Sequence, residues 1–233
     1  MAAVIQRLID KLDGFEIVRN KVGAILLLES QHQQTLALAA SRDMNDWAFR
    51  VFSERTNPIG EFLDIPDDAS SPPLVLPIVN VWYNGTTFDK SASNLVERQK
   101  GTSTINVDVY TYATSADQLV GHSPGDERAA RELHRVVRLV RNILMAGSYT
   151  YLGLRGFVWE RWLPAIEIFE PPTDGRAAQR IGAARLGLQV VHNEFSPQYE
   201  GVPLEGVDLS VLRRESGELY IEADFNFAGA ESP

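Results

Sequence analysis

The spacing of apolar residues predicts two helices near the start of the chain. Apolar side chains recur at helical spacing from Val4 to Leu12, and Gly14 follows as a C-terminal stop. A second helix is expected over residues 20–40. Its polar run Glu29–Gln34 is interpreted as a solvated face, and the alternative is a surface that meets another protein. Residues 47–55 then alternate as a short strand.

Two strands are expected in the middle of the chain. Residues 56–77 contain five prolines and several aspartates, which predicts a loop because proline cannot donate to a strand ladder. Strands follow at residues 78–83 and 105–112. Asn84-Gly85 is typical of a hairpin turn, and the polar stretch 86–102 is expected to be an extended loop.

The clearest element is an amphipathic helix over residues 124–146. Ser123 is placed to cap it, with proline at the first helical position, and Gly147 is a stop signal. Apolar residues fill one half of the helical wheel. The opposite half carries a stripe of four arginines: Arg128, Arg131, Arg135 and Arg138.

Strands are also expected at residues 157–170, 183–195 and 219–227. Helices, paired strands, a long helix and further strands predict an α+β fold. Its mostly antiparallel sheet is packed by one long amphipathic helix, with N-terminal helices and long loops. The chain is predicted to divide into four segments. They are an N-terminal helical segment (residues 1–55), a Pro-rich loop (56–77), an α+β core (78–200) and an acidic C-terminal extension (201–233).

Composition narrows the class of protein. The 233 residues are 44% hydrophobic and carry a net charge of −9, which disfavours general nucleic-acid binding because phosphate neutralisation needs clustered Lys and Arg. The absence of cysteine excludes disulfides, thiolate metal sites and Cys nucleophiles. The longest apolar run, Ala24–Leu28, is too short to span a bilayer, and no export signal precedes it, so a soluble protein without membrane contact is expected.

The charge is distributed unevenly. Residues 194–233 hold nine acids and two bases, whereas residues 126–141 hold five arginines and three acids. The arginine stripe therefore has three interpretations: a solvated face, a phosphate-binding face, or an interface that pairs with carboxylates of a neighbouring subunit. The acidic whole argues against the second interpretation, and the acidic C-terminal region supplies carboxylates for the third.

Catalytic and metal signatures are sparse. His192 and Glu194 share a face of a strand and form two thirds of a metal site, although a surface hydrogen bond or ion pair is the favoured interpretation. Glu160 and Glu167 are the carboxylates that a small hydrolase would use, but their alternation favours outward-facing strand residues. No catalytic residue, metal or cofactor is predicted.

Several strings together resemble the tail-terminator, or tail-completion, proteins of contractile-tailed bacteriophages. The resemblance covers roughly residues 20–200 and rests on apolar strands and one helix, without a catalytic motif. The strings, in chain order, are VGAILLLESQHQQTLALAA, LPIVNVWYNG, STINVDVYTYA, GDERAARELHRVVRLVRNILMAGSYTYLGL, VWERWLPAIEIF and RLGLQVVHNEFSP.

The resemblance implies a non-enzymatic virion subunit, assembled in the bacterial host cytoplasm. It would form a hexameric ring at the head-proximal end of the tail. There it stops polymerisation of tube and sheath proteins and docks head-completion or neck proteins, while DNA passes through the lumen without specific binding. The Pro-rich loop and the acidic extension leave open an alternative role, in which the chain forms an adjacent neck ring such as a collar or gateway. A carboxylate-dependent hydrolase is the alternative from another class.

Overall fold

The chain forms two compact units in the computed structural model, and each is described by itself. One unit spans residues 10–196, and the other joins residues 1–9 with residues 197–233. The structure describes residues 8–63, 75–90, 98–118, 121–171, 180–195, 206–212 and 219–226.

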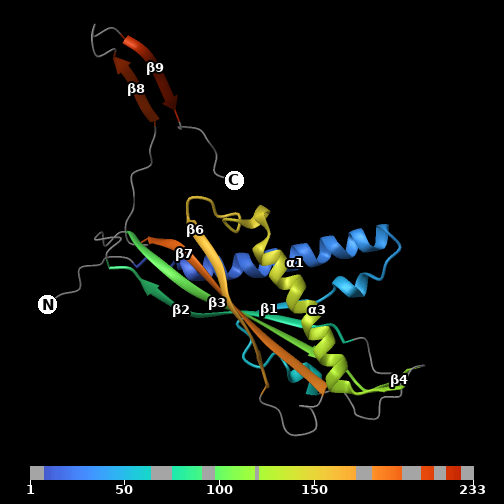
Figure 1. The fold of residues 1–233 in the computed structure, drawn as a ribbon. Helices are drawn as coiled ribbons and strands as arrows, with labels where there is room; N and C mark the ends of the chain where they lie inside the picture. The colour runs from blue at the N-terminus through green and yellow to red at the C-terminus, as the bar shows by residue number, and fades with distance from the viewer. Residues whose placement is uncertain are drawn as a thin grey trace, which may run out of the picture. The chain divides into compact units, whose positions relative to one another are not determined.

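A twisted five-stranded sheet is the centre of the larger unit (Figure 1). Only the first pair of strands is parallel, and the other neighbours are antiparallel, so the predicted α+β fold with a mostly antiparallel sheet is confirmed. Across the sheet the strands are β1 (Arg50–Ser53), β2 (Ile78–Phe88), β3 (Arg98–Tyr112), β7 (Ile181–Phe195) and β6 (Val158–Phe169). A small ladder joins β4 (Ala116–Gln118) to β5 (Gly121–Ser123).

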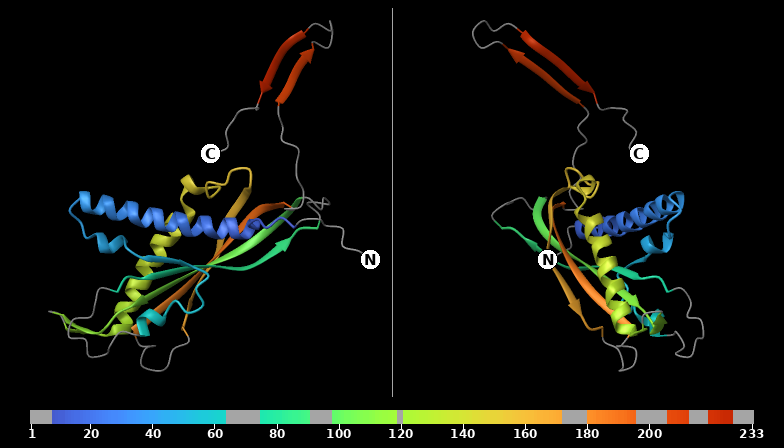
Figure 2. Two further views of the ribbon diagram at one scale, coloured as in Figure 1. Left: turned by 180° about the vertical axis from the view of Figure 1, so that it is seen from behind. Right: turned by 45° about the vertical axis from the view of Figure 1, so that its right-hand side comes forward.

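Two long helices, α1 (Gly14–Ala39) and α3 (Gly125–Met145), cross one face of this sheet (Figure 2). Their buried residues join the side chains that β2, β3 and β7 present on that face in one apolar core. In α3 the buried positions are those that the helical wheel predicts, because their spacing follows the turn of the helix. They are Ala129, Leu133, Val136, Val140 and Leu144.

The opposite face of the sheet carries no long helix among the described residues. The short helix α2 (Gly60–Leu63) packs there through Phe62, with Ile59, against Ile78 and Tyr110. Two 3₁₀ turns complete the unit: η1 (Met44–Trp47), which follows α1, and η2 (Gly147–Tyr149), which follows α3. The two faces are called the helix face and the open face below.

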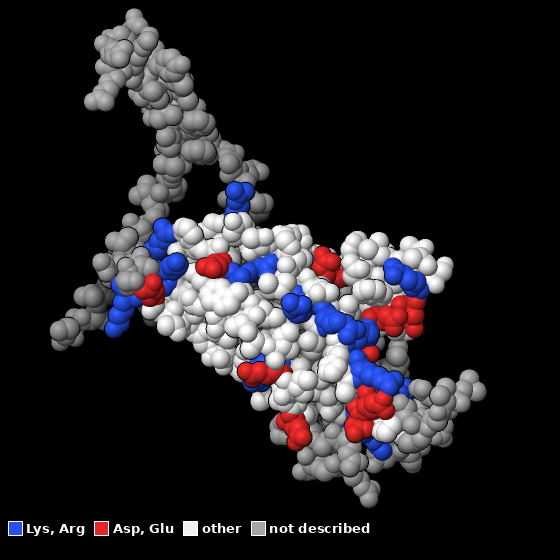
Figure 3. All heavy atoms as spheres, viewed as in Figure 1, with Lys and Arg blue, Asp and Glu red and all other residues white. Residues whose placement is uncertain are grey.

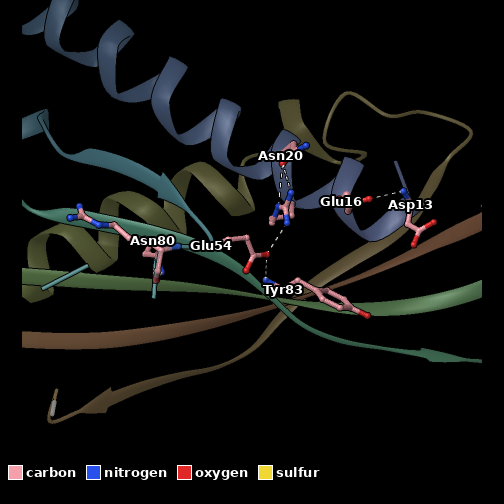
Figure 4. Close-up of polar contacts among 8 residues, drawn as sticks. Asp13, Glu16, Asn20, Glu54, Asn80 and Tyr83 are labelled. Atoms are coloured by element: carbon pink, nitrogen blue, oxygen red, sulfur yellow. Dashed lines mark hydrogen bonds and ion pairs between the residues drawn. The ribbon is translucent and has the colours of Figure 1, made fainter. Parts of the chain in front are cut away.

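The start of α1 corrects the prediction for the N-terminus. Gly14 begins a helix instead of ending one, and residues 8–13 are not helical. The N-cap is Asp13, whose N–H donates to Glu16 Oε2 at 2.9 Å, as Figure 4 shows. Beyond the first turn, Glu54 ties the helix to the sheet by accepting from Arg19 and from the backbone N–H of Tyr83. The first contact caps the start of α1, and the contacts of Glu54 hold its first turns against β2.

The Asn84-Gly85 dipeptide is not a hairpin turn. β2 continues through it to Phe88, and the register with β3 shifts between Tyr83 and Gly85, so the dipeptide forms a β-bulge. The stretch expected to be a loop therefore supplies strand residues at both ends, since β3 begins at Arg98. The long helix fits its prediction to within one residue, with its N-cap at Pro124 in place of Ser123.

The smaller unit contains a two-stranded hairpin of β8 (Gly206–Leu212) and β9 (Leu219–Asn226). The sequence predicts β9 to within one residue and misses β8. The aspartates at 64, 67 and 68, which belong to the Pro-rich loop, lie outside the described residues.

Candidate interface and buried polar clusters

The four arginines of the predicted stripe divide into two pairs. Arg128 and Arg135 are two turns apart on one side of α3, and Arg135 is close enough to η1 for the charge of Asp46 to act on it. Arg128 donates to the Thr114 carbonyl at 2.7 Å, and Arg135 pairs with Glu132, which raises the pKa of Arg135 above its ordinary value. These two guanidinium groups are therefore already engaged within the subunit.

Arg131 and Arg138 lie on the outer side of α3. The Arg131 side chain is 70% exposed and pairs with Glu127 one turn away, an ion pair that water screens strongly. Arg138 is exposed, and no carboxylate of the described residues pairs with it. Figure 3 shows basic and acidic side chains intermingled along the line that α3 follows in Figure 1. The face that remains available to a partner is thus narrower than the sequence predicts.

Grooves flank α3 on both sides. Between α3, α1 and η1 lies a groove of about 260 Å³, lined by Glu29, Trp47 and Ile143 among others. Between α3 and the strands β6 and β7 lies a second one of about 420 Å³, which includes Ala130 and Ile168. Both are lined by apolar and polar side chains together, as protein contacts are.

Strand β6 is an open edge of the sheet. Trp159, Ile166 and Ile168 are 55%, 41% and 68% exposed, and the hydrogen-bonding edge of β6 that faces away from β7 has no partner strand among the described residues. Soluble proteins usually protect such edges, because an unpaired apolar edge associates with other chains. Exposed leucines also lie along α1: Leu27, Leu28, Leu36 and Leu38.

A buried charge lies on the open face of the sheet. The Asp108 side chain is only 3% exposed and accepts two hydrogen bonds from Arg185, at 2.7 Å from Nε and 2.9 Å from Nη2. Trp82 Nε1 donates to Asp108 Oδ2 at 2.9 Å, and the Tyr110 hydroxyl donates to the same oxygen at 3.3 Å. The guanidinium group of Arg185 lies 4.9 Å from the ring of Trp82 and 5.1 Å from that of Phe169.

The electrostatics of this cluster favour a structural role. Burial, followed by the charge of Asp108, raises the pKa of Tyr110 above its ordinary value, so the hydroxyl stays a donor. A polar cavity of about 310 Å³ borders the cluster, with Glu54 and Arg55 on its rim. Because every oxygen of Asp108 already accepts a hydrogen bond, the carboxylate is not free to act as a base.

A second polar cluster lies on the helix face. Ser103 Oγ is 2.7 Å from His192 Nε2 and 2.6 Å from Thr86 Oγ1, which accepts from the Tyr83 hydroxyl at 2.9 Å. If each hydroxyl donates to the next group, Nε2 accepts and the proton of His192 is on Nδ1. That atom faces Glu194 Oε2 at 4.0 Å.

Glu194 connects this cluster to the start of α1. The backbone N–H of Gly14 donates to both carboxylate oxygens of Glu194, at 2.9 and 2.8 Å. A carboxylate at a helix N-terminus is stabilised by the free N–H groups of the first turn. The side chain of His192 is completely buried and stacks on Phe157 at 5.5 Å, and burial lowers the pKa of His192. The imidazole is therefore neutral at pH 7.

The side chains of Ser103, His192 and Glu194 follow one another as hydroxyl, imidazole and carboxylate, as in a hydrolytic triad. Unlike the hydroxyl of such a triad, the Ser103 hydroxyl is not accessible to solvent. Ser103 and His192 have no exposed surface, so no substrate reaches the hydroxyl. Among the described residues, no group of three or more His, Asp or Glu side chains is placed to hold a metal ion. The predicted surface position of His192 is wrong, because the N-terminus of α1 and Phe157 cover this end of β7.

Glu160 and Glu167, the carboxylates of the hydrolase alternative, are both exposed on β6. Their partners in the ladder, Val191 and Arg185, are six residues apart on β7, which corresponds to about 20 Å along the strand. Carboxylate pairs in glycoside hydrolases are separated by roughly 5–10 Å. This arrangement therefore does not support a catalytic pair.

No protein-family model matches the chain, and no curated protein matches its sequence. None of the described helices is long and apolar enough to cross a membrane.

Proposed function

We propose that the chain is a structural subunit of a phage virion. It forms a ring, six copies in the resembled family, at the head-proximal end of the tail. The ring ends the polymerisation of the tube and sheath and joins the tail to the neck. The observation that carries this proposal is the distribution of exposed basic and apolar surface over separate parts of one subunit. Arg131 and Arg138 lie on α3, and exposed Ile166 and Ile168 lie on the open edge β6.

Closed rings need this kind of subunit. A heterologous contact joins two different patches, so each copy must present both. In the proposed ring, the outer arginines of α3 meet carboxylates of the acidic region 194–233 in a neighbouring copy. Arg128 instead ties the start of α3 to the Thr114 carbonyl, and Arg135 is paired with Glu132 of the same helix.

Termination is then a matter of shape. One face of the ring matches the last ring of tube subunits, and the other face presents a surface on which the next tube subunit finds no complementary site. Head-completion or neck proteins dock on that second face, in a virion assembled in the cytoplasm of the bacterial host. A net charge of −9 per subunit fits a lumen through which DNA slides without being held.

The test is the double variant Arg131→Glu with Arg138→Glu. Reversal of both charges should abolish rings in negative-stain images and reduce the molar mass measured by light scattering to that of the single chain, because two attractive contacts become repulsive. The matched control is Lys11→Glu with Arg155→Glu, which changes the net charge equally at exposed residues outside α3. Rings that persist in the α3 variant, or that disappear in both, would contradict the assignment of α3 to the interface.

The position in the virion needs a second measurement. Tail tubes made of the tube subunit from the same source should be capped at one end by the purified chain and should stop growing. A chain that binds only the head-side proteins would favour the adjacent collar or gateway ring. A monomer that neither forms rings nor caps tubes at any concentration would overturn the proposal.

A further inference from the structure

The groove between α1, η1 and α3 contains a carboxylate without a cation. Glu29 of α1 is half-buried in its wall and accepts a hydrogen bond from the Tyr149 hydroxyl. Among the described residues, no lysine, arginine or histidine forms an ion pair with Glu29. A half-buried carboxylate has lost part of its hydration, and one neutral donor replaces only part of that loss. The groove therefore presents a negative charge to a cation from outside the chain.

The walls of the groove are held by contacts within the larger unit. The Ser30 hydroxyl donates to the Trp47 carbonyl at 2.8 Å, which ties η1 to α1. The hydrogen bond to Glu29, followed by burial, raises the pKa of Tyr149 above its ordinary value, so the hydroxyl remains a donor. The carboxylate is thus held in one place before any ligand arrives, which lowers the cost of binding.

Aromatic and aliphatic side chains line the groove beside this carboxylate. Trp47 and Tyr149 contribute rings, and Leu139 and Ile143 of α3 contribute aliphatic surface. Aromatic faces attract cations, and the guanidinium group of Arg42 already lies 5.9 Å from the ring of Trp47, although Arg42 does not line the groove. Such a lining suits a cation that is carried on an apolar stem.

The polar atoms of the groove favour a primary ammonium group over a guanidinium group. Tyr149 engages Oε1 of Glu29 and leaves Oε2 for a ligand, whereas a guanidinium group pairs best with both oxygens of a carboxylate. An ammonium group is a compact charge with three donors, and the amide oxygens of Gln33 and Asn142 are further acceptors in the lining. The volume of about 260 Å³ is smaller than that of pockets that enclose drug-sized molecules, so it fits a single side chain.

We infer that the groove lined by Glu29, Trp47 and Tyr149 binds a lysine side chain of another protein. The ammonium group pairs with Glu29, and the aliphatic stem of the lysine packs against Leu139 and Ile143. This site does not depend on a role in a phage tail, because a partner in any assembly can supply the lysine.

The indole N–H of Trp47 reports on the groove in a proton–nitrogen NMR spectrum of the full chain. The chain has four tryptophans, and Trp47→Phe identifies the signal. The probe is n-butylammonium, which has the stem and charge of a lysine side chain, and n-butanol is its neutral counterpart. At pH 7 and low salt, n-butylammonium should shift the Trp47 signal in a saturable way, and added salt should weaken the binding. n-Butanol should bind at least about tenfold more weakly, because it lacks the charge.

Two variants that each remove one negative charge provide the matched comparison. Glu29→Gln should weaken the binding of n-butylammonium at least about tenfold, because glutamine keeps the shape and an acceptor for Tyr149 but lacks the charge. Glu160→Gln, at an exposed residue of β6 outside the groove, should leave the dissociation constant unchanged. Equal binding by wild type and Glu29→Gln, or equal shifts with n-butylammonium and n-butanol, would overturn the inference.

A blocked peptide with one lysine between two alanines tests whether a lysine within a protein enters the groove. It should bind at least as tightly as n-butylammonium, and the same peptide with norleucine in place of lysine should not bind. A lysine peptide that fails to shift the Trp47 signal would show that the groove does not accept a side chain on a backbone, and would overturn the inference. So would a molar mass that rises with protein concentration in wild type but not in Glu29→Gln, because the lysine would then belong to a second copy.

Discussion

The two polar clusters of the larger unit lie on opposite faces of the same two strands. On the helix face, Ser103 of β3 meets His192 of β7 in a neutral hydrogen-bond chain. On the open face, Asp108 of β3 meets Arg185 of β7 in an ion pair whose arginine is 36% exposed. The completely covered cluster is thus uncharged, whereas the charged one keeps one partner in contact with water.

The difference follows from the cost of burying charge. A charged group loses several kcal/mol of hydration in the protein interior unless a partner and hydrogen bonds replace the water. Asp108 has two hydrogen bonds from Arg185 and others from Trp82 and Tyr110, so its charge is retained. The imidazole of His192 has no such compensation and stays neutral. The largest effects are therefore expected where the charge of Asp108 loses its partner.

Arg185→Met should destabilise the fold most. Methionine keeps contact with Trp82 and Phe169 but leaves the carboxylate of Asp108 buried without its cation, which costs about 3 kcal/mol in the free energy of unfolding. Chemical denaturation measures the change. Adding Asp108→Asn to this variant should recover at least half of the loss, because the buried charge is removed too. If the double variant is as unstable as the single one, packing and not charge holds the cluster together.

Gly14→Ala tests the neutral cluster and should cost less. A Cβ atom at this position would clash with Glu194 Oε2 and lie 2.8 Å from His192 Nδ1, so the carboxylate must move away from the helix N-terminus. Overpacking of this kind costs about 1–3 kcal/mol. Gly147→Ala is the control, since a Cβ there meets no atom within 4 Å. Equal stabilities of the two variants would show that the contact between Gly14 and Glu194 does not anchor α1.

The sequence could predict α3 but not the start of α1, for a reason that these clusters make clear. Periodicity and caps are local signals, and in α3 they agree with the buried face. Gly14 is also a local stop signal, and the local cap of Asp13 with Glu16 competes with it. The structure begins a helix at Gly14, where Glu194, 180 residues later, also accepts the Gly14 N–H. No local pattern contains that partner.

The polar clusters were beyond sequence analysis for a similar reason. Alternation along β3 assigns Asn106 and Asp108 to the face opposite Ile105 and Val107, as observed, but it does not show that this face is covered too. Asp108 is buried because Trp82, Tyr110 and Arg185 surround it. The helical wheel places all four arginines of the stripe away from the core, and helical spacing also places Glu132 next to Arg135. The Thr114 carbonyl that engages Arg128 appears only in the structure.

Acid should weaken the neutral cluster through His192. The pKa of this imidazole is lowered by burial from an unfolded value of about 6.5, so below that pH the unfolded chain binds a proton that the folded chain does not. Stability from this group is complete above pH 6.5 and falls as the pH decreases. The difference in the free energy of unfolding between wild type and His192→Gln, measured from pH 7.5 to 5, isolates this group. A difference that grows as the pH falls would mean that Glu194 holds a protonated imidazole instead.

The smallest change in the free energy of unfolding is expected for an ion pair that, unlike Asp108 with Arg185, is exposed on both sides. Arg131 and Glu127 form an ion pair as close as any on α3, but their side chains are 70% and 47% exposed, so neither charge lost much hydration on folding. Glu127→Gln should therefore change the free energy of unfolding by at most about 0.5 kcal/mol, and less at high salt. Glu132→Gln, whose partner Arg135 is only 23% exposed, should cost somewhat more in the same thermal or chemical denaturation. If Glu127→Gln cost as much as Arg185→Met, exposure would not be what separates the two kinds of ion pair, and the contrast between the faces of β3 and β7 would need another cause.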